Sequence, residues 1–118
     1  MKLLSDRYER QLKKGALEIV ILRLIERRPS YGYELLTELE QKSGRFFSLR
    51  EGTLYPILYR LEDDGLIRAQ WDTGKSRSAP KKIYTITPKG RETLEQLCNV
   101  WRQFAKSVNE LLFEEDLS

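Results

Sequence analysis

The sequence predicts a mainly α-helical domain with one small β-hairpin, an α+β fold that ends in a long C-terminal helix. Three observations predict it. Apolar residues recur at helical spacing over most of the 118 residues. They alternate at strand spacing only between residues 66 and 87, and glycine or proline stands where one period changes to the other. A chain of this length forms one domain with one modest core.

Composition excludes several classes of function. The chain has no histidine and one cysteine, which excludes a Ser-His-Asp triad, a Cys-His dyad, a Cys/His zinc site and an internal disulfide. No apolar run reaches the roughly 20 residues of a membrane span, and residues 1–14 are too charged for a signal peptide. We expect no enzyme, cofactor, metal or membrane partner, and a cytoplasmic location. An enzyme is only a remote alternative. The acidic cluster Glu62, Asp63 and Asp64 could supply paired carboxylates, but the sequence implies no pocket around it.

The first helix is expected over residues 11–27. Its apolar residues surround most of the helical circumference instead of forming one stripe. Such a helix needs cover on two sides, and a domain this small covers one side with its own chain. The second face is therefore expected to meet a partner subunit.

Two shorter helices follow. Pro29 and Ser30 end the first helix, and a second is expected over residues 31–42, with Tyr31 on its apolar face and Gly44 as a left-handed cap. A third is expected over residues 49–64, where Ser48 to Glu51 fit a capping box and Gly65 ends the helix.

The alternating pattern predicts two strands, over residues 66–71 and 82–87. Residues 72–81 between them are rich in Gly, Ser, Lys and Arg. Residues 73–91 hold six basic residues and no acidic one, although the rest of the chain is more acidic than basic. Such a hairpin tip would attract a phosphate backbone. The alternative is a solvated loop that only aids solubility.

The fourth helix is expected to begin at Thr87-Pro88, since proline is favoured at the first helical position. From residue 94 its apolar residues are spaced alternately three and four apart, which is a heptad seam. Because the other elements already fill the core, we expect this seam to pair with a second copy of the chain. Residues 1–90 would then form the DNA-binding domain, with the first helix also at the dimer interface, and residues 91–118 the dimerisation helix. The residues expected at that interface are Leu12, Ile19, Leu94, Leu97, Trp101, Phe104, Val108 and Leu111.

Three helices followed by a basic hairpin is the element order of a winged helix-turn-helix domain. The third helix, residues 49–64, would enter the major groove of double-stranded DNA, and the wing, residues 72–82, would lie on phosphates or in the minor groove. Arg50 can donate two hydrogen bonds to guanine, and Thr53 can meet a base edge, whereas wing cations would contact phosphate without reading sequence. The residues expected to contact DNA are Arg50, Thr53, Tyr55, Tyr59, Arg60, Lys75, Arg77, Lys81 and Lys82.

Alternatives remain open at single positions. Gly52 either allows close approach to DNA or is an ordinary first-turn residue, and the two tyrosines either face DNA or are half-buried under the wing. Pro56 is either tolerated near the start of the helix or kinks it. Cys98 is expected to be a small packed residue, since the sequence brings nothing basic near it.

Several sequence strings resemble the PadR family of bacterial transcription regulators. The resemblance covers residues 15–94, and its strings are Gly15-Ala16-Leu17-Glu18, Tyr31-Gly32-Tyr33-Glu34-Leu35, Gly52-Thr53-Leu54-Tyr55-Pro56 with Arg60-Leu61-Glu62 and Gly65-Leu66-Ile67, and Lys82-Ile83-Tyr84 with Ile86-Thr87 and Gly90. It implies a homodimeric repressor whose last helix packs against the partner's first and last helices. The wing departs from many relatives, because residues 76–81 replace a glycine-rich tip with a stiffer, more basic one.

The resemblance also implies a candidate effector site. Some family members bind small aromatic or drug-like compounds at the dimer interface, and Trp101 lies at a position similar to their tryptophan, with Leu12, Ile19, Leu97 and Ala105 as candidate walls. The alternative is ordinary packing of a large side chain in the seam.

The function expected is therefore a homodimeric, sequence-specific DNA-binding regulator of the PadR type, a repressor located on the bacterial nucleoid. The alternative is a winged-helix module that binds proteins and has lost DNA affinity. Within the first interpretation, a phenolic- or drug-responsive repressor and a clock-associated cyanobacterial regulator both stay open.

Overall fold

The computed structural model describes residues 2–73 and 79–113. It contains a three-stranded sheet and four helices, which confirm the predicted fold class, mainly α with a small β-hairpin. In chain order the elements are α1 (Lys2–Arg27), β1 (Ser30–Tyr31), α2 (Gly32–Lys42), α3 (Glu51–Asp63), β2 (Ile67–Asp72), β3 (Lys81–Ile86) and α4 (Pro88–Leu112).

The first helix is longer than the apolar pattern predicted, because α1 begins at Lys2 and not at residue 11. Its early residues include no glycine or proline, and several are strong helix formers, so nothing delays the helix until residue 11. The C-terminal half of α1 lies at the centre of the core. The fully packed apolar residues are Leu17, Ile21, Leu22, Leu24, Ile25, Leu35, Leu39, Leu54, Ile57, Leu58, Leu61, Leu66, Ile67, Tyr84 and Leu94.

The sheet has the order β1-β3-β2 and contains one strand that the sequence did not predict. In β1, Ser30 pairs with Tyr84 and Tyr31 pairs with Ile83. Tyr31 thus belongs to a strand and not to the second helix. Its backbone N–H donates to Glu34 Oε1 at 2.9 Å at the start of α2. A two-residue strand has no alternation to detect, and β1 is defined by its pairing with β3, beside which Ser30 is buried.

The predicted hairpin is confirmed, with β2 and β3 in antiparallel register from Ile67 opposite Ile86 to Asp72 opposite Lys81. The predicted capping box of α3 is wrong. Arg50 is the N-cap residue, with φ −103° and ψ 163°, and its side chain makes no capping bond among the described residues. Ser48 lies two residues too early to cap this helix. The helix runs on through Pro56.

α4 begins where proline predicted it. The Thr87 hydroxyl accepts the N–H of Gly90 at 3.0 Å and donates to the Gly65 carbonyl at 2.6 Å, which ties α4 to the turn before β2. Leu94, expected in an intermolecular seam, is 2% exposed and packs in the chain's own core. Leu94 is buried because α4 crosses the C-terminal half of α1 before it extends beyond the core.

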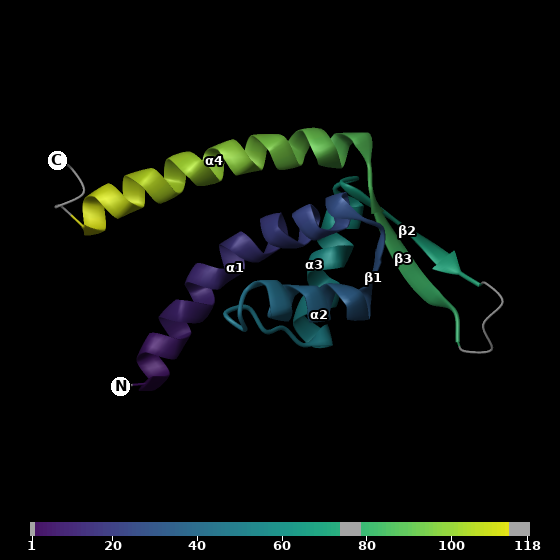
Figure 1. Cartoon of the computed structure of the whole chain (residues 1–118), viewed down its shortest axis with the longest axis horizontal. Coiled ribbons are helices and arrows are strands. Elements are labelled where there is room, and N and C mark those ends of the chain that lie inside the picture. Colours follow the sequence, from purple (N-terminus) through teal and green to yellow (C-terminus); the bar gives the residue numbers. More distant parts are fainter. Residues whose placement is uncertain (1, 74–78, 114–118) are drawn as a thin grey trace.

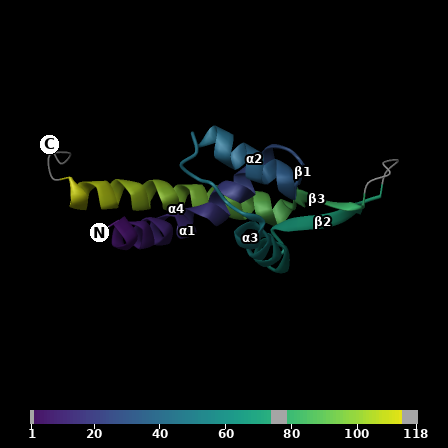
Figure 2. The same ribbon diagram turned by 90° about the horizontal axis from the view of Figure 1, so that it is seen from below.

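α1 and α4 converge near the sheet and separate toward the N-terminal end of α1 and the C-terminal end of α4 (Figure 1). The β2–β3 hairpin extends from the end of the molecule opposite to the two chain termini, as Figure 2 also shows. The molecule is flat and elongated, 59 × 36 × 23 Å. No helix within the described residues is long and apolar enough to cross a membrane. The same residues hold no cluster of three or more metal-ligating side chains.

Candidate nucleic-acid interface

The outer face of α3 is open at its N-terminal end. Leu54, Ile57, Leu58 and Leu61 face the core. The backbone carbonyl of Arg50 accepts the N–H groups of Thr53 and Leu54, each at 3.0 Å. The side chains of Arg50 and Thr53 are exposed. The two residues predicted to read bases therefore lie together at the start of α3.

The two tyrosines of α3 differ in role. Tyr59 is 52% exposed. Tyr55 is half-buried and packs on the start of α2, where a Cβ built at Gly32 would lie 2.6 Å from its Oη. Tyr55 thus holds α2 and α3 together, and Gly32 leaves the space that it needs. Tyr55 is half-buried, but against the start of α2 and not under the wing as the alternative had it, and Tyr59 stays on the exposed face.

Arg60 is engaged within the chain. Its Nε donates to Glu18 Oε1 of α1 at 2.8 Å, with both side chains partly exposed. Because the guanidinium is directed toward α1, Arg60 lies apart from Arg50 and Thr53. The sequence pattern placed it on the exposed side of α3 and did not indicate this ion pair.

The described part of the wing carries two lysines on opposite faces of β3. Lys81 Nζ lies 5.2 Å from the ring centroid of Tyr33, and Lys82 Nζ lies 5.3 Å from that of Trp71. Lys75 and Arg77 lie outside the described residues. Trp71 is 63% exposed and was not among the predicted site residues. Strand alternation places it on the same face as buried Ile67, so the pattern gave no signal that its indole would lie in solvent.

Side chains of β1 and α2 support the base of the wing. The Tyr31 hydroxyl donates to the Asp72 carboxylate, and this bond is the largest cause of the raised pKa of Tyr31. The Tyr31 ring stacks on Tyr33, with centroids 5.7 Å apart and planes 7° apart. These contacts connect the end of β2 to the start of α2.

A second open surface is an apolar groove between α1 and α4. Its volume is about 890 Å³. Of the predicted interface residues, Leu12, Ile19, Trp101 and Phe104 line it. Phe46 and Phe47, from the connection between α2 and α3, also line it and were not among the predicted interface residues. Phe47 packs against the core, whereas Phe46 is exposed.

Lys13 and Cys98 lie beside this groove. Lys13 Nζ donates to the Phe46 carbonyl and lies 4.1 Å from its ring centroid. Cys98 is a small side chain packed against the core, as predicted, but it has a basic neighbour that the sequence did not indicate, because Arg23 Nη2 lies 3.4 Å from its sulfur. The sequence could not indicate this contact, since the two residues belong to different helices.

Arg23 also belongs to an ionic network that joins α1 to α4. It donates to Glu26 at 2.8 Å, and Arg91 of α4 lies 3.3 Å from the same carboxylate. The hydrogen bond from Arg23 is the main cause that lowers the pKa of Glu26.

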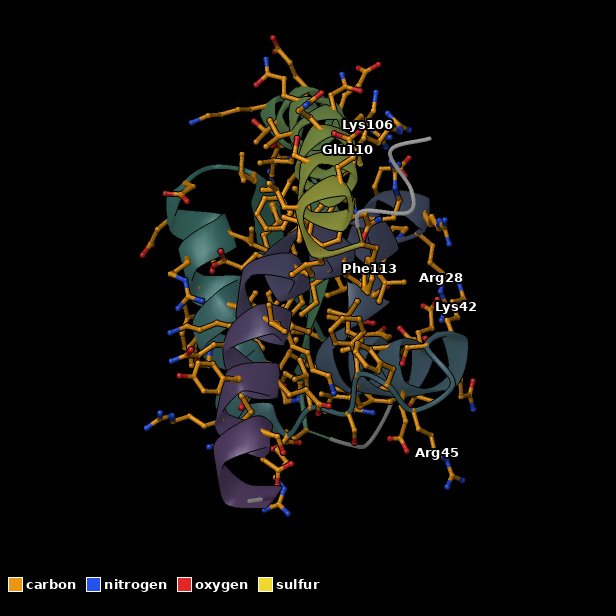
Figure 3. All side chains as sticks on the ribbon, turned by 90° about the vertical axis from the view of Figure 1, so that its left-hand side faces the viewer. Arg28, Lys42, Arg45, Lys106, Glu110 and Phe113 are labelled. Carbon is orange, nitrogen blue, oxygen red and sulfur yellow. The ribbon has the colours of Figure 1, made fainter. Side chains whose placement is uncertain are left out.

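Two basic residues near α2 are paired with acidic side chains. Arg28 lies 3.4 Å from both Glu34 and Glu38, and Lys42 lies 2.8 Å from Glu38. Figure 3 shows Arg28 and Lys42 close together at the outer side of α2. It also shows Lys106 and Glu110 on the side of α4 away from α1, opposite the groove.

A helix-turn-helix formed by α2 and α3, followed by a projecting hairpin, defines this chain as a winged helix-turn-helix protein. Comparison with known families is more specific. The sequence pattern that defines the transcriptional regulator PadR-like family matches residues 21–96 of this chain. The chain belongs to this family, which confirms the resemblance found in the sequence.

Individual relatives agree with this assignment. The chain is 34% identical over 104 residues to an uncharacterized protein of Lysinibacillus sphaericus, covering 88% of this chain and 93% of that protein. It is 31% identical over 78 residues to the negative transcriptional regulator PadR of Bacillus subtilis, covering 66% of this chain. The alignment spans only 42% of that regulator's length.

Solved structures of similar proteins share the fold. A PadR family transcriptional regulator from Eggerthella lenta has a TM-score of 0.82 and 31% identity, over 95% of this chain and 94% of its own. A PadR-like transcriptional regulator from Bacillus cereus has a TM-score of 0.73 and 38% identity, over 87% and 97% of the two chains.

Proposed function

We propose that this chain is a homodimeric, sequence-specific DNA-binding repressor that acts on the bacterial nucleoid. The observation that carries the proposal is the combination of an exposed α3 N-terminus with a basic segment, residues 73–91, that contains no acidic residue, on one winged helix-turn-helix unit. A module that binds only proteins has no need of such a segment. Membership in a family of transcriptional regulators supports the same function.

In the proposed complex α3 enters the major groove with Arg50 and Thr53 at base edges and Tyr59 beside a phosphate. Lys81 and Lys82 contact phosphates, together with Lys75 and Arg77 of the wing tip. Tyr55 and Arg60 are left out of this set, because both are engaged within the chain.

The proposed dimer forms along the groove and the free part of α4. Large apolar side chains are exposed there, which is costly for a monomer. Leu94 is left out because it is buried in the core, so the dimerisation segment proposed over residues 91–118 starts beyond it. The exposed apolar residues of the described part of that segment are Val100, Trp101, Phe104, Leu111, Leu112 and Phe113.

We also propose that the groove beside Trp101 takes a small planar aromatic effector. Its volume of about 890 Å³ lies in the range of drug-sized sites. Trp101 and Phe104, whose ring centroids are 5.5 Å apart, offer aromatic faces to such a molecule. The competing proposal is that the partner's own side chains fill the groove.

The test of the DNA proposal is a binding titration on the chain's own upstream DNA across a salt series. The slope of log K against log salt should be steep for the unaltered protein. In a variant with Lys75, Arg77, Lys81 and Lys82 changed to Gln, the slope should become shallower. Its magnitude should decrease by about 0.9 for each phosphate that the wing no longer neutralises.

A control variant, Lys42→Gln with Lys106→Gln, removes charge from surfaces outside the proposed interface and should keep the original slope. Weak, salt-independent binding by both the unaltered protein and the wing variant would contradict the proposal.

A further inference from the structure

Trp71 is a large apolar side chain that the fold leaves in solvent. It lies near the free end of β2 and is 63% exposed. Lys82 lies directly opposite in the β2–β3 register, with its ammonium 5.3 Å from the indole centroid. The pair is therefore an apolar surface and a cation held side by side on the wing.

The sheet register shows which way this pair faces. Side chains two residues apart share a face of a strand, so Trp71 shares a face with Ala69 and Ile67. Opposite Ala69 lies Tyr84, which is 1% exposed and packs in the core. Trp71 and Lys82 form the next row outward on the same face.

That face is the one covered by α3. Tyr55 and Tyr59 of α3 lie close enough to Tyr84 to contribute to its raised pKa, and α3 contacts β2. Following the face outward from Tyr84 leads past the edge of α3 to Trp71. We therefore expect a duplex that receives α3 in its major groove to lie close to Trp71 and Lys82.

The surroundings of Trp71 argue against a protein-docking patch. The side chain directly opposite the indole on its own face is the cation Lys82, and Tyr84, the next aromatic inward, is buried, so the exposed surface here combines one apolar ring with a charge. The competing structural role is a cross-strand cation–π pair, which stabilises a hairpin only modestly. That role does not explain why so large a side chain lies beyond the core.

We propose that Trp71 and Lys82 form a composite DNA contact, in which the indole packs on a deoxyribose at the minor-groove edge and the ammonium neutralises the adjacent phosphate. Sugar and phosphate are the parts of a duplex that a wing reaches without base-specific hydrogen bonds. Apolar side chains also enter the minor groove in other DNA complexes, where they insert between base steps; the contact proposed here is shallower, on the sugar at the edge of that groove. The inference rests on the proposed DNA-binding function and deepens it.

The experiment compares Trp71→Ala, Trp71→Phe and the control Gln70→Ala in titrations on the same upstream DNA. Trp71→Ala should bind about tenfold more weakly, from the apolar area that would leave the interface, with an unchanged salt slope because the variant keeps every charge. Trp71→Phe should retain most of the affinity. Gln70→Ala, on the opposite face of the same strand, should bind like the unaltered protein.

Fluorescence gives a second readout that does not depend on the stability of the alanine variant. The chain has two tryptophans, so Trp101→Phe leaves Trp71 as the sole emitter. Its emission should be quenched or shifted when the duplex is added.

The outcomes separate the two proposals. The composite contact is overturned if the unaltered protein binds DNA in a salt-dependent way while Trp71→Phe and Trp71→Ala bind DNA with the same affinity and Trp71 emission does not change. The proposed DNA-binding function would still stand in that case. Absence of salt-dependent binding by the unaltered protein overturns both.

Discussion

A side chain at position 90 would collide with backbone. A Cβ built on Gly90 meets the Leu66 carbonyl oxygen, and it would lie 2.7 Å from Ile86 Cγ1. Gly52, also in a helix, has nothing within 4 Å of such an atom in the described part of the chain. Packing within the chain therefore requires glycine at position 90, whereas no packing within the described chain requires it at position 52.

We predict that Gly90→Ala lowers the free energy of unfolding by more than about 2 kcal/mol, because the backbone of the turn before β2 must move. Gly52→Ala should raise it by less than the roughly 0.5–1 kcal/mol that separates the two residues in the middle of a helix, because Gly52 lies in the first turn of α3. Denaturant unfolding measures both. If DNA approaches α3 closely at Gly52, the stabilised Gly52→Ala variant should still bind DNA more weakly. Equal decreases of stability in both variants would contradict the prediction.

Tyr84 is the basis of a pH prediction. Burial is the main cause that raises its pKa to about 12, and its hydroxyl is buried without a hydrogen-bond partner among the described residues. In the unfolded chain a tyrosine titrates near pH 10. Between these two values the unfolded state loses the proton and the folded state keeps it, so the folded state loses stability as pH rises.

The expected loss between about pH 10 and pH 12 is on the order of 2 kcal/mol, and this part should disappear in Tyr84→Phe. At neutral pH the same variant should be as stable as the unaltered protein or slightly more stable, because a buried unpaired hydroxyl is removed. Unfolding titrations at several alkaline pH values measure the effect, with exposed Tyr59→Phe as the control. Identical alkaline profiles for the unaltered protein and Tyr84→Phe would refute the assignment.

At the scale of elements, α4 serves two surfaces along one helix. Its first part is anchored in the core by Leu94, and its later part carries exposed Trp101 and Phe104 beside the groove. Lys106 lies on the side away from α1. The proposed dimer interface therefore uses one side of α4 and should tolerate changes on the other.

We predict that Phe104→Glu shifts the protein from dimer to monomer at micromolar concentration, because a carboxylate would be buried without a partner in the interface. Lys106→Glu, on the polar side of the same helix, should remain dimeric. Analytical ultracentrifugation distinguishes the two states. The same sedimentation behaviour for both variants would remove the groove side of α4 from the interface.

At the scale of the whole molecule, the groove and the proposed DNA surface are connected through the segment between α2 and α3. Phe46 and Phe47 line the groove, and Arg50, the N-cap of α3, follows four residues after Phe46. Because backbone and packed side chains link the two surfaces, a ligand that displaces these phenylalanines would also shift the start of α3.

We predict that a planar aromatic compound that quenches Trp101, measured in a Trp71→Phe background, lowers DNA affinity by at least about fivefold. The coupling should be reciprocal, so saturating DNA should weaken the compound's binding by the same factor. Fluorescence and DNA titrations measure the two sides. Absence of quenching at millimolar compound would favour simple packing of Trp101.

The sequence by itself determined the type and order of most elements. Helical spacing, strand alternation after Gly65 and the Thr87-Pro88 start of α4 are local patterns, and each follows from the period of one segment. The family followed as well, since its strings lie within single elements. Of the predicted site, the exposed positions of Arg50, Thr53 and Tyr59 agreed with the structure.

Tertiary structure alone decided which of the predicted site side chains are packed or paired within the chain itself. Tyr55 and Arg60 belong to the same helix pattern as Tyr59, yet one packs on Gly32 and the other pairs with Glu18. Leu94 follows the same heptad as Trp101 but lies in the core. A periodic pattern specifies the face of a residue within its own element, whereas the partner across that face comes from distant chain and depends on how the elements pack together.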